Sequence, residues 1–202
     1  MSLQASLELI LAKDQPLRHL HDWTWQQLAA AAASPRHGWN QASLVTTDDR
    51  RPHSRMVVLP TSDATRQRLE CHTDRRADKV QQIARCPQVA WMFWDPRSRI
   101  QLRLIANAEI LSDNPDVDQA WRDVPLRSRS AYLSLAAPGR SVTTDHPPST
   151  DDRDADADAS ERGRQNFCIV RTTIESADAL YLRKNGHVRF ALNNGTAAWL
   201  VP

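Results

Sequence analysis

The chain begins with apolar residues at helical spacing and then changes to alternating apolar and polar positions. Near the start, apolar residues fall at i, i+3, i+4 and i+7, which predicts one face of a helix that ends before residue 38. That face comprises Trp25, Leu28, Ala29 and Ala32. Beyond residue 40 the period falls to about two, which is typical of strands. The pattern therefore predicts a helical beginning and a β-rich body.

The alternating segments are predicted to be antiparallel strands joined by short turns. They cover residues 41–47, 56–59, 69–73, 89–94, 100–110, 167–174, 179–183, 188–192 and 196–201. In the fifth of these segments, Gln101 and Arg103 alternate with leucines, which predicts one polar surface and one surface that faces the core. Asn-Gly pairs at 185–186 and 194–195 signal tight turns between the last strands.

Helices are expected between some of these strands. Asp74 is expected to cap a helix that ends near Pro87. Residues 114–124 again carry apolar residues at helical spacing, and a second short helix is expected at 130–135. Many antiparallel strands with inserted helices indicate a mainly β, α+β fold built on a small closed or nearly closed barrel. We expect one domain over residues 1–202, with helices at its N-terminus.

Residues 143–164 differ in composition from the rest of the chain. They are rich in Asp, Pro, Ser and Thr and contain too little apolar surface to offset the entropy of ordering. This segment is predicted to be a mobile surface loop. Its aspartates lack the glycine and terminal glutamate of an EF-hand loop, so no metal site is predicted there.

Overall composition narrows the class of protein. The chain has 202 residues and a formal net charge of +2, which argues weakly against a nucleic-acid binder. No apolar run is long enough for a membrane helix, and the N-terminus does not resemble a secretory signal. Three cysteines without Cys-x-x-Cys spacing indicate reduced thiols. We therefore expect a cytoplasmic globular protein.

Cations gather around one predicted strand and one predicted helix start. Arg55 lies on the strand at 56–59 or at its edge, and Arg75, Arg76 and Lys79 lie around the beginning of the helix after Asp74. Backbone N–H groups and cations in such a place can bind an anion together, so a ligand that carries phosphate is the first candidate. The alternative is a solvated basic cap with no ligand.

Several motifs, in this order and at this spacing, resemble the pyridoxamine 5'-phosphate oxidase family. They are Arg-Pro-x-x-Arg-Met-Val-x-Leu at 51–59, His-Thr-Asp-Arg-Arg at 72–76, Lys79, Phe-Trp-Asp-Pro-Arg at 93–97 and Arg-Ile-Gln at 99–101. The resemblance runs from about residue 43 to the end of the chain and is strongest to an uncharacterised oxidase-related branch. It implies a split β-barrel homodimer that binds two FMN molecules at the subunit interface.

The resemblance also implies which residues contact the cofactor. It places Arg55 and Lys79 at the FMN phosphate, Gln101 near the flavin of the other subunit, and Arg189 near the flavin ring. The full set of implied cofactor-binding residues is Arg55, Met56, Val57, Val58, His72, Thr73, Arg75, Arg76, Lys79, Gln101, Arg140, Ser141 and Arg189. His187 is a weak candidate for a general acid or base, and a polar residue at a hairpin end is the alternative.

Departures from the family pattern affect the substrate contacts more than the cofactor contacts. Pro60 stands where members that oxidise pyridoxamine phosphate have a lysine, and Asn185 stands where they have an arginine before the retained His187. Asp78 and Leu180 replace a further arginine and a tryptophan. We therefore expect FMN binding without vitamin B6 oxidase activity.

Three classes of function remain open from the sequence. The first is an FMN-dependent oxidoreductase that moves two electrons between the flavin and a small substrate or NAD(P)H. The second is a flavin carrier or sensor, and the third is a cofactor-free dimeric interaction module. Related split barrels bind haem or a deazaflavin, so those cofactors are alternatives to FMN.

Overall fold

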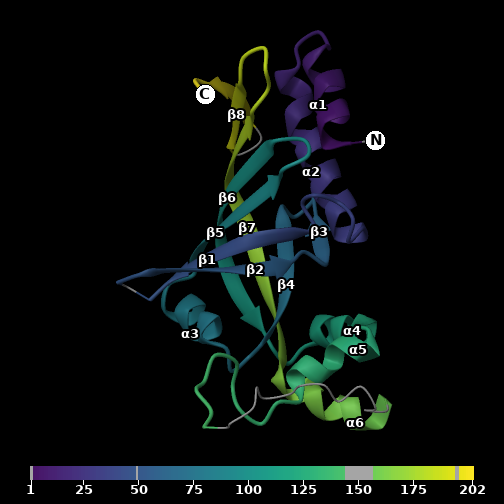
Figure 1. The fold of residues 1–202 in the computed structure, drawn as a ribbon, viewed down its shortest axis with the longest axis vertical. Helices are drawn as coiled ribbons and strands as arrows, with labels where there is room; N and C mark the ends of the chain where they lie inside the picture. The colour runs from purple at the N-terminus through teal and green to yellow at the C-terminus, as the bar shows by residue number, and fades with distance from the viewer. Residues whose placement is uncertain (1, 49, 144–156, 194–195) are drawn as a thin grey trace.

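The computed structural model describes residues 2–48, 50–143, 157–193 and 196–202, and its centre is a strongly twisted antiparallel sheet (Figure 1). Within the described residues the sheet has nine strands. They are β1 (Gln41–Thr47), β2 (Pro52–Val58), β3 (Thr61–Asp63), β4 (Arg68–Asp74), β5 (Gln88–Asp95), β6 (Ile100–Leu111), β7 (Phe167–Tyr181), β8 (Val188–Asn193) and β9 (Thr196–Leu200). The mainly β, antiparallel fold class predicted from the sequence is confirmed.

Strand β7 organises the sheet because its two halves have different neighbours. One edge pairs with β6 along its length, whereas the other edge pairs with β4 in the first half and with β8 in the second half. The path β2-β1-β5-β6-β7-β4-β3 then curls into a half-barrel, with β8 and β9 extending from β7. A register shift between Ile105 and Ala106 marks where β6 bends along β7.

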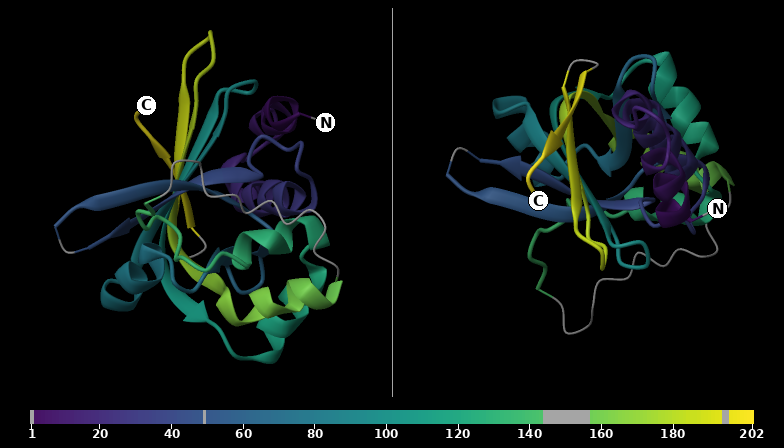
Figure 2. Two further views of the ribbon diagram at one scale, coloured as in Figure 1. Left: turned by 60° about the horizontal axis from the view of Figure 1, so that its bottom comes forward. Right: turned by 90° about the horizontal axis from the view of Figure 1, so that it is seen from above.

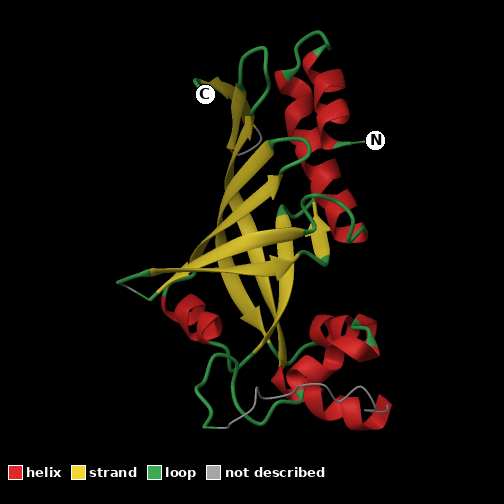
Figure 3. Cartoon of the chain, in the orientation of Figure 1, coloured by secondary structure: helices red, strands yellow, loops and turns green. Residues whose placement is uncertain are grey.

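Helices cover the two ends of the elongated molecule (Figure 3). Helices α1 (Leu3–Leu11) and α2 (Leu17–Ala33) lie beside the β8 end, and α3 (Asp78–Arg85) follows β4. Helices α4 (Pro115–Asp123), α5 (Leu126–Arg129) and α6 (Ala157–Glu161) gather at the opposite end, together with the short 3-10 helices η1 (Ser130–Tyr132) and η2 (Arg162–Asn166). Figure 2 shows this second group beneath the sheet.

The main core lies between the concave face of the sheet and α2. Trp91 and Phe93 of β5 stack with ring centroids 5.8 Å apart, and both are fully buried. Trp39 packs against Phe93, and Trp23 of α2 packs edge-on against Trp39. A second apolar cluster forms around Phe167, where Trp121 of α4 contacts it at the start of β7. The two clusters hold the helical groups against opposite ends of the sheet.

The structure corrects several sequence-based expectations. The two strands predicted at 167–174 and 179–183 form the single strand β7, because pairing with β6 continues across the register shift. Residues 157–164, assigned to the loop, lie in α6 and η2, and Glu161 of α6 accepts a hydrogen bond from the indole of Trp121. On α2, Ala29 is exposed, whereas Ala31 is buried. The turn expected at 194–195 and most of the loop expected at 143–164 lie outside the described residues.

The helix after β4 begins later than predicted. Its N-cap is Ala77, whose side chain makes no capping hydrogen bond. The carboxylate of Asp74 instead accepts hydrogen bonds from the backbone N–H and the guanidinium of Arg76. Asp74 therefore neutralises a neighbouring cation, and the α3 N-terminus has no side-chain cap.

The length and polarity of the described helices differ from those of a membrane-spanning helix. No helix in the described part of the chain is long and apolar enough to cross a membrane.

Candidate functional site

A cleft of about 1170 Å³ opens between the half-barrel and the helices that follow β6. Its walls come from the end of β2, from β3 and β4, and from α4, α5 and the residues next to them. Met56, Val57 and Val58 line it from β2, while His72 and Lys79 line it from β4 and α3. The fold therefore brings five of the predicted cofactor-binding residues to one cleft.

Lys79 is a partly buried cation at the inner end of this cleft. It lies in the first turn of α3, and its Nζ donates a 2.7 Å hydrogen bond to the hydroxyl of buried Thr73. Burial, and more weakly the nearby charge of Arg55, lowers the pKa of Lys79. An ammonium has three N–H donors, so two remain for a ligand.

Arg55 is the second partly buried cation in this region. Its guanidinium donates to the carbonyl of Leu44 at 3.0 Å, to Thr46 Oγ1 at 2.8 Å and to Gln82 Oε1 at 3.2 Å. These three acceptors are neutral, and burial lowers the pKa of Arg55. Arg55 thus ties β2 to β1 and α3 while its charge remains uncompensated by any carboxylate of the described residues.

His72 is held in its neutral form by its surroundings. It projects into the cleft from β4, and its ring lies 4.9 Å from the ring of Phe167 in an edge-on arrangement. Burial lowers the pKa of His72 to about 4, although the charge of Asp123 opposes the shift. The imidazole is therefore a neutral donor and acceptor at ordinary pH.

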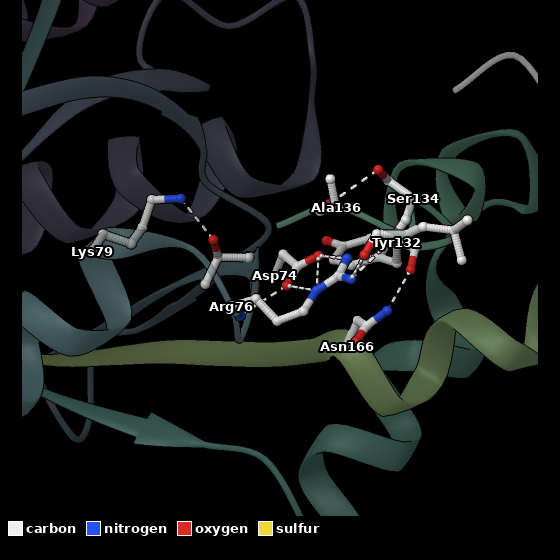
Figure 4. Close-up of polar contacts among 9 residues, drawn as sticks. Asp74, Arg76, Lys79, Tyr132, Ser134, Ala136 and Asn166 are labelled. Carbon is white, nitrogen blue, oxygen red and sulfur yellow. Dashed lines mark hydrogen bonds and ion pairs between the residues drawn. The ribbon is translucent and has the colours of Figure 1, made fainter. Parts of the chain in front are cut away.

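Arg76 is not among the residues that line the cleft, and it has its own partners (Figure 4). Its Nη2 lies 2.7 Å from Asp74 Oδ2, and its Nη1 donates to the carbonyl of Ser134 at 2.8 Å. Arg75 is exposed, and its backbone N–H bonds the carbonyl of Asn166. Of the three cations predicted around this helix start, only Lys79 lines the cleft.

Four other predicted site residues lie outside the cleft. Arg140 and Ser141 are exposed in the segment that follows η1. Gln101 and Arg189 both pair with Leu180 of β7 in the strand register, so their side chains share one face of the sheet. The guanidinium of Arg189 is ion-paired with Asp178, which also binds Arg103. Within one copy of the chain, none of these four residues lines the cleft that Lys79 lines.

The weak catalytic candidate His187 belongs to a second, smaller cleft. This cleft of about 450 Å³ lies between α1 and the β8–β9 hairpin, and Arg189 and Trp199 also line it. His187 itself is exposed just before β8. Within one subunit it shares no cleft with His72 or Lys79.

The sequence analysis missed the charged wall of the large cleft. Arg68 and Glu70 line it from β4, and Arg171 lines it from β7. Glu70 Oε1 lies 2.6 Å from Arg171 Nε, and Asp116 of α4 lies 2.7 Å from the same guanidinium. The alternation of Glu70 and His72 on the strand predicted at 69–73, continued by Arg68 just before it, was a usable signal, because residues two apart share a face.

Two of the three thiols, those of Cys71 and Cys168, are not reactive centres. Cys71 and Cys168 are buried on neighbouring strands, and burial raises the pKa of both to about 12. Such thiols are poor nucleophiles because the thiolate is the reactive form. Among the described residues, no group of His, Cys, Asp and Glu is arranged to hold a metal ion.

Comparison with known protein families finds a match to the first part of the chain. Residues 21–112 match the family model of the pyridoxamine 5'-phosphate oxidase, FMN-binding domain. The chain is 25% identical over 195 residues to pyridoxine/pyridoxamine 5'-phosphate oxidase 2 of Arabidopsis thaliana, covering 89% of this chain and 95% of that protein. It is 31% identical over 121 residues to pyridoxine/pyridoxamine 5'-phosphate oxidase of Trichormus variabilis, covering 59% of this chain and 53% of that protein.

Solved structures show the same fold at low sequence identity. One is a pyridoxamine 5'-phosphate oxidase-related, FMN-binding protein from Nostoc punctiforme, with a TM-score of 0.67, 20% identity and coverage of 89% of this chain and 96% of that one. Another is PhzG from Burkholderia lata in complex with tetrahydrophenazine-1-carboxylic acid, with a TM-score of 0.65, 14% identity and coverage of 95% and 94%.

The inner end of the cleft fits the cofactor of this family. Lys79 and Arg55 are partly buried cations without a bonded carboxylate, and the adjacent α3 N-terminus has no side-chain cap. A phosphate group suits such a set of donors, because it accepts charge-assisted hydrogen bonds and compensates both charges. Residues 21–112 of this split-barrel chain therefore resemble the FMN-binding domain of the pyridoxamine 5'-phosphate oxidase family, whose cofactor is FMN.

Proposed function

We propose that this protein is an FMN-dependent oxidoreductase that binds the cofactor in the large cleft and acts on a small substrate. The observation that carries the proposal is a pair of partly buried cations: Lys79 lines that cleft, and Arg55 lies next to it, outside the lining, where it bonds Gln82 of the same helix. The family match to an FMN-binding domain supports the choice of cofactor over haem or a deazaflavin.

Each residue has a distinct part in this proposal. Lys79 and Arg55 bind the phosphate, and the main chain of Met56 to Val58 forms the wall beside the flavin. The chemistry that bound FMN supplies is reversible two-electron transfer. His72 stays neutral near that wall because burial lowers its pKa, so it can accept or donate a hydrogen bond without adding charge.

A second copy of the chain completes the site in this proposal. The outward face of the sheet carries exposed apolar side chains, which a soluble monomer rarely groups together. They are Met56 at 64%, Val58 at 53%, Ile105 at 45% and Trp94 at 42% exposure. Gln101 and Arg189 lie on this face, outside the large cleft of their own subunit. A homodimer formed through it can supply both residues to the partner's flavin.

We further propose that vitamin B6 oxidation is not the activity. Pro60 lines the cleft, and its side chain offers no donor to a substrate phosphate. The Arabidopsis thaliana relative bears an oxidase name, but only a quarter of the aligned residues are identical. Turnover of pyridoxamine 5'-phosphate by the purified protein at a useful rate would contradict this part of the proposal.

The cofactor assignment is tested by measuring FMN affinity from the quenching of flavin fluorescence. We expect Lys79→Met and Arg55→Ala each to raise the Kd roughly tenfold to a hundredfold, because each removes a charge-assisted hydrogen bond. Arg66→Met is the matched control: Arg66 lines the same cleft but is ion-paired with Asp63 and largely exposed. The proposal fails if the parent protein retains no FMN, or if both variants bind FMN like the parent.

Catalysis is tested separately from binding. An oxidoreductase should show bleaching of the flavin absorption on anaerobic addition of NADH, NADPH or a reducing substrate, followed by reoxidation and repeated turnover. Tight FMN binding without reduction by any donor would instead favour the flavin carrier or sensor.

A further inference from the structure

The wall of the large cleft contains an arginine whose side chain bonds none of the described residues. Arg68, at the start of β4, lines the cleft, and its Nε is buried without a hydrogen-bond partner. A guanidinium has five N–H donors and is charged at any physiological pH. N–H donors of a partly buried cation that lack a hydrogen-bond partner destabilise the free protein, and a bound anion supplies the missing acceptor.

The carboxylates around Arg68 already have other partners. Asp63, its cross-strand neighbour, bonds Arg66 through both the backbone and the side chain. Glu70 and Asp116 both bind Arg171. The remaining carboxylate of the lining, Asp123, accepts from the amide of Gln119. Among the described residues of the cleft wall, Arg68 is thus the arginine with no bonded carboxylate.

Arg68 is far from the cations proposed to bind the cofactor phosphate. Thr73, the partner of Lys79, lies five positions further along β4, which is roughly 17 Å of extended strand. The cleft volume of about 1170 Å³ also exceeds the roughly 300–1,000 Å³ typical of a pocket for one ligand. The cleft therefore has room for a second molecule beside the cofactor, at the Arg68 end.

We propose that Arg68 binds a carboxylate of the substrate and determines the specificity of the cleft for monoanionic acids. The inference rests on the proposed function: FMN is taken to bind at the Lys79 side of the cleft, and Arg68 then remains accessible to the substrate. A carboxylate suits this place better than a phosphate monoester, because one planar guanidinium matches its two oxygens and its single charge. A phosphate dianion would need a second cation, and the nearby Arg66 and Arg171 are neutralised.

Binding of two simple probes to the FMN-loaded protein tests this inference. Benzoate carries a carboxylate and phenyl phosphate carries a phosphate, and both are titrated by calorimetry and by the change in flavin absorption. We expect the parent to bind benzoate more tightly than phenyl phosphate. Arg68→Met should weaken benzoate binding roughly tenfold to a hundredfold, and Arg68→Lys should weaken it less, since it keeps the charge but loses the planar fork.

Arg66→Met is the control, because it removes the same charge from the same cleft wall but from an ion-paired, exposed side chain. It should change benzoate affinity by less than about twofold. FMN affinity should be unchanged in all three variants, and Arg68→Lys carries the test if Arg68→Met does not fold.

Three results would overturn the inference while leaving the proposed function intact: no benzoate binding by the FMN-loaded parent, equal binding by the parent and the Arg68 variants, or tighter binding of phenyl phosphate. Loss of FMN from the Arg68 variants alone would assign Arg68 to the cofactor and likewise overturn it. Absence of FMN from the parent itself would overturn the proposed function and this inference together.

Discussion

Burial without a counter-charge distinguishes a few cations from the many arginines of this chain. Arg76, Arg129, Arg171 and Arg189 each have a carboxylate partner. Lys79 and Arg55, by contrast, bond only neutral oxygens. Isolated charges are costly to bury, so a protein keeps such side chains where a ligand supplies the missing charge. The candidate ligand site is therefore recognised by partly buried cations that have no bonded carboxylate among the described residues.

His72 leads to a prediction about the pH dependence of stability. Burial lowers its pKa in the folded protein to about 4 from 6.5. Between these values the unfolded chain binds more protons, so the free energy of unfolding rises with pH through this window and is lost as pH falls from about 6.5 to 4. We expect His72→Phe to remove part of this loss, roughly 1–3 kcal/mol.

Urea unfolding of both proteins at pH 7 and pH 4.5, without FMN, measures the effect. The quantity to compare is the loss of unfolding free energy between the two pH values, because the carboxylates titrate in both proteins and contribute equally to both losses. An identical loss in the parent and in His72→Phe would show that the imidazole is not kept neutral by burial.

The loop before β1 and the turn between β5 and β6 touch at Gly38. A Cβ placed on Gly38 would lie 2.5 Å from Asp95 Cγ, so glycine leaves space for that side chain. Asp95 is buried, and its carboxylate accepts the backbone N–H groups of Arg97 and Ser98. The contact fixes the approach of α2 to the β5–β6 turn.

We expect Gly38→Ala to lower the free energy of unfolding by roughly 1–3 kcal/mol, because the added methyl group collides with a carboxylate held by two hydrogen bonds. In an Asp95→Gly background the same substitution should cost clearly less, since all of the side-chain atoms that the methyl group meets, Cβ included, are gone. Urea unfolding of the two single variants and the double variant gives the coupling energy. Strictly additive costs would contradict the proposed contact.

The exposed apolar side chains on the outward face of the sheet lead to a prediction about dimerisation. Ile105 lies on β6 in this face and is 45% exposed. If a second copy covers the face, Ile105→Glu buries an unpaired charge and should weaken dimerisation roughly a hundredfold. Sedimentation velocity over a range of protein concentrations measures the change, and FMN retention should fall with dimer content.

Leu9→Glu is the matched control, because Leu9 is 59% exposed on α1 and lies off the sheet. It should leave both the oligomeric state and FMN affinity unchanged. A parent protein that sediments as a monomer while retaining FMN would contradict the homodimer. In that case Gln101 and Arg189 would have no route to the flavin.

Much of the fold was predictable because its signals are local. The alternation at 41–47 and 100–110 identified β1 and β6 almost to the residue, and the helical spacing at 114–124 identified α4. The short strand β3 was missed, and β7 was divided in two, because both depend on pairing with distant strands. Motif order led to Lys79, whereas Arg68 and Arg171 were missed, since only tertiary contacts show which charges are paired.

The sequence by itself determined most of the strands and helices, the resemblance to one family and the presence of cations near one helix start, because periodicity, turn residues and motif spacing are written along the chain. Only the tertiary structure decided that Arg76 is neutralised by Asp74 while Lys79 faces a cleft. It also decided that Gln101 and Arg189 share the outward face of the sheet and do not line that cleft. Burial and pairing of charges arise between residues far apart in the sequence, so no local pattern encodes them.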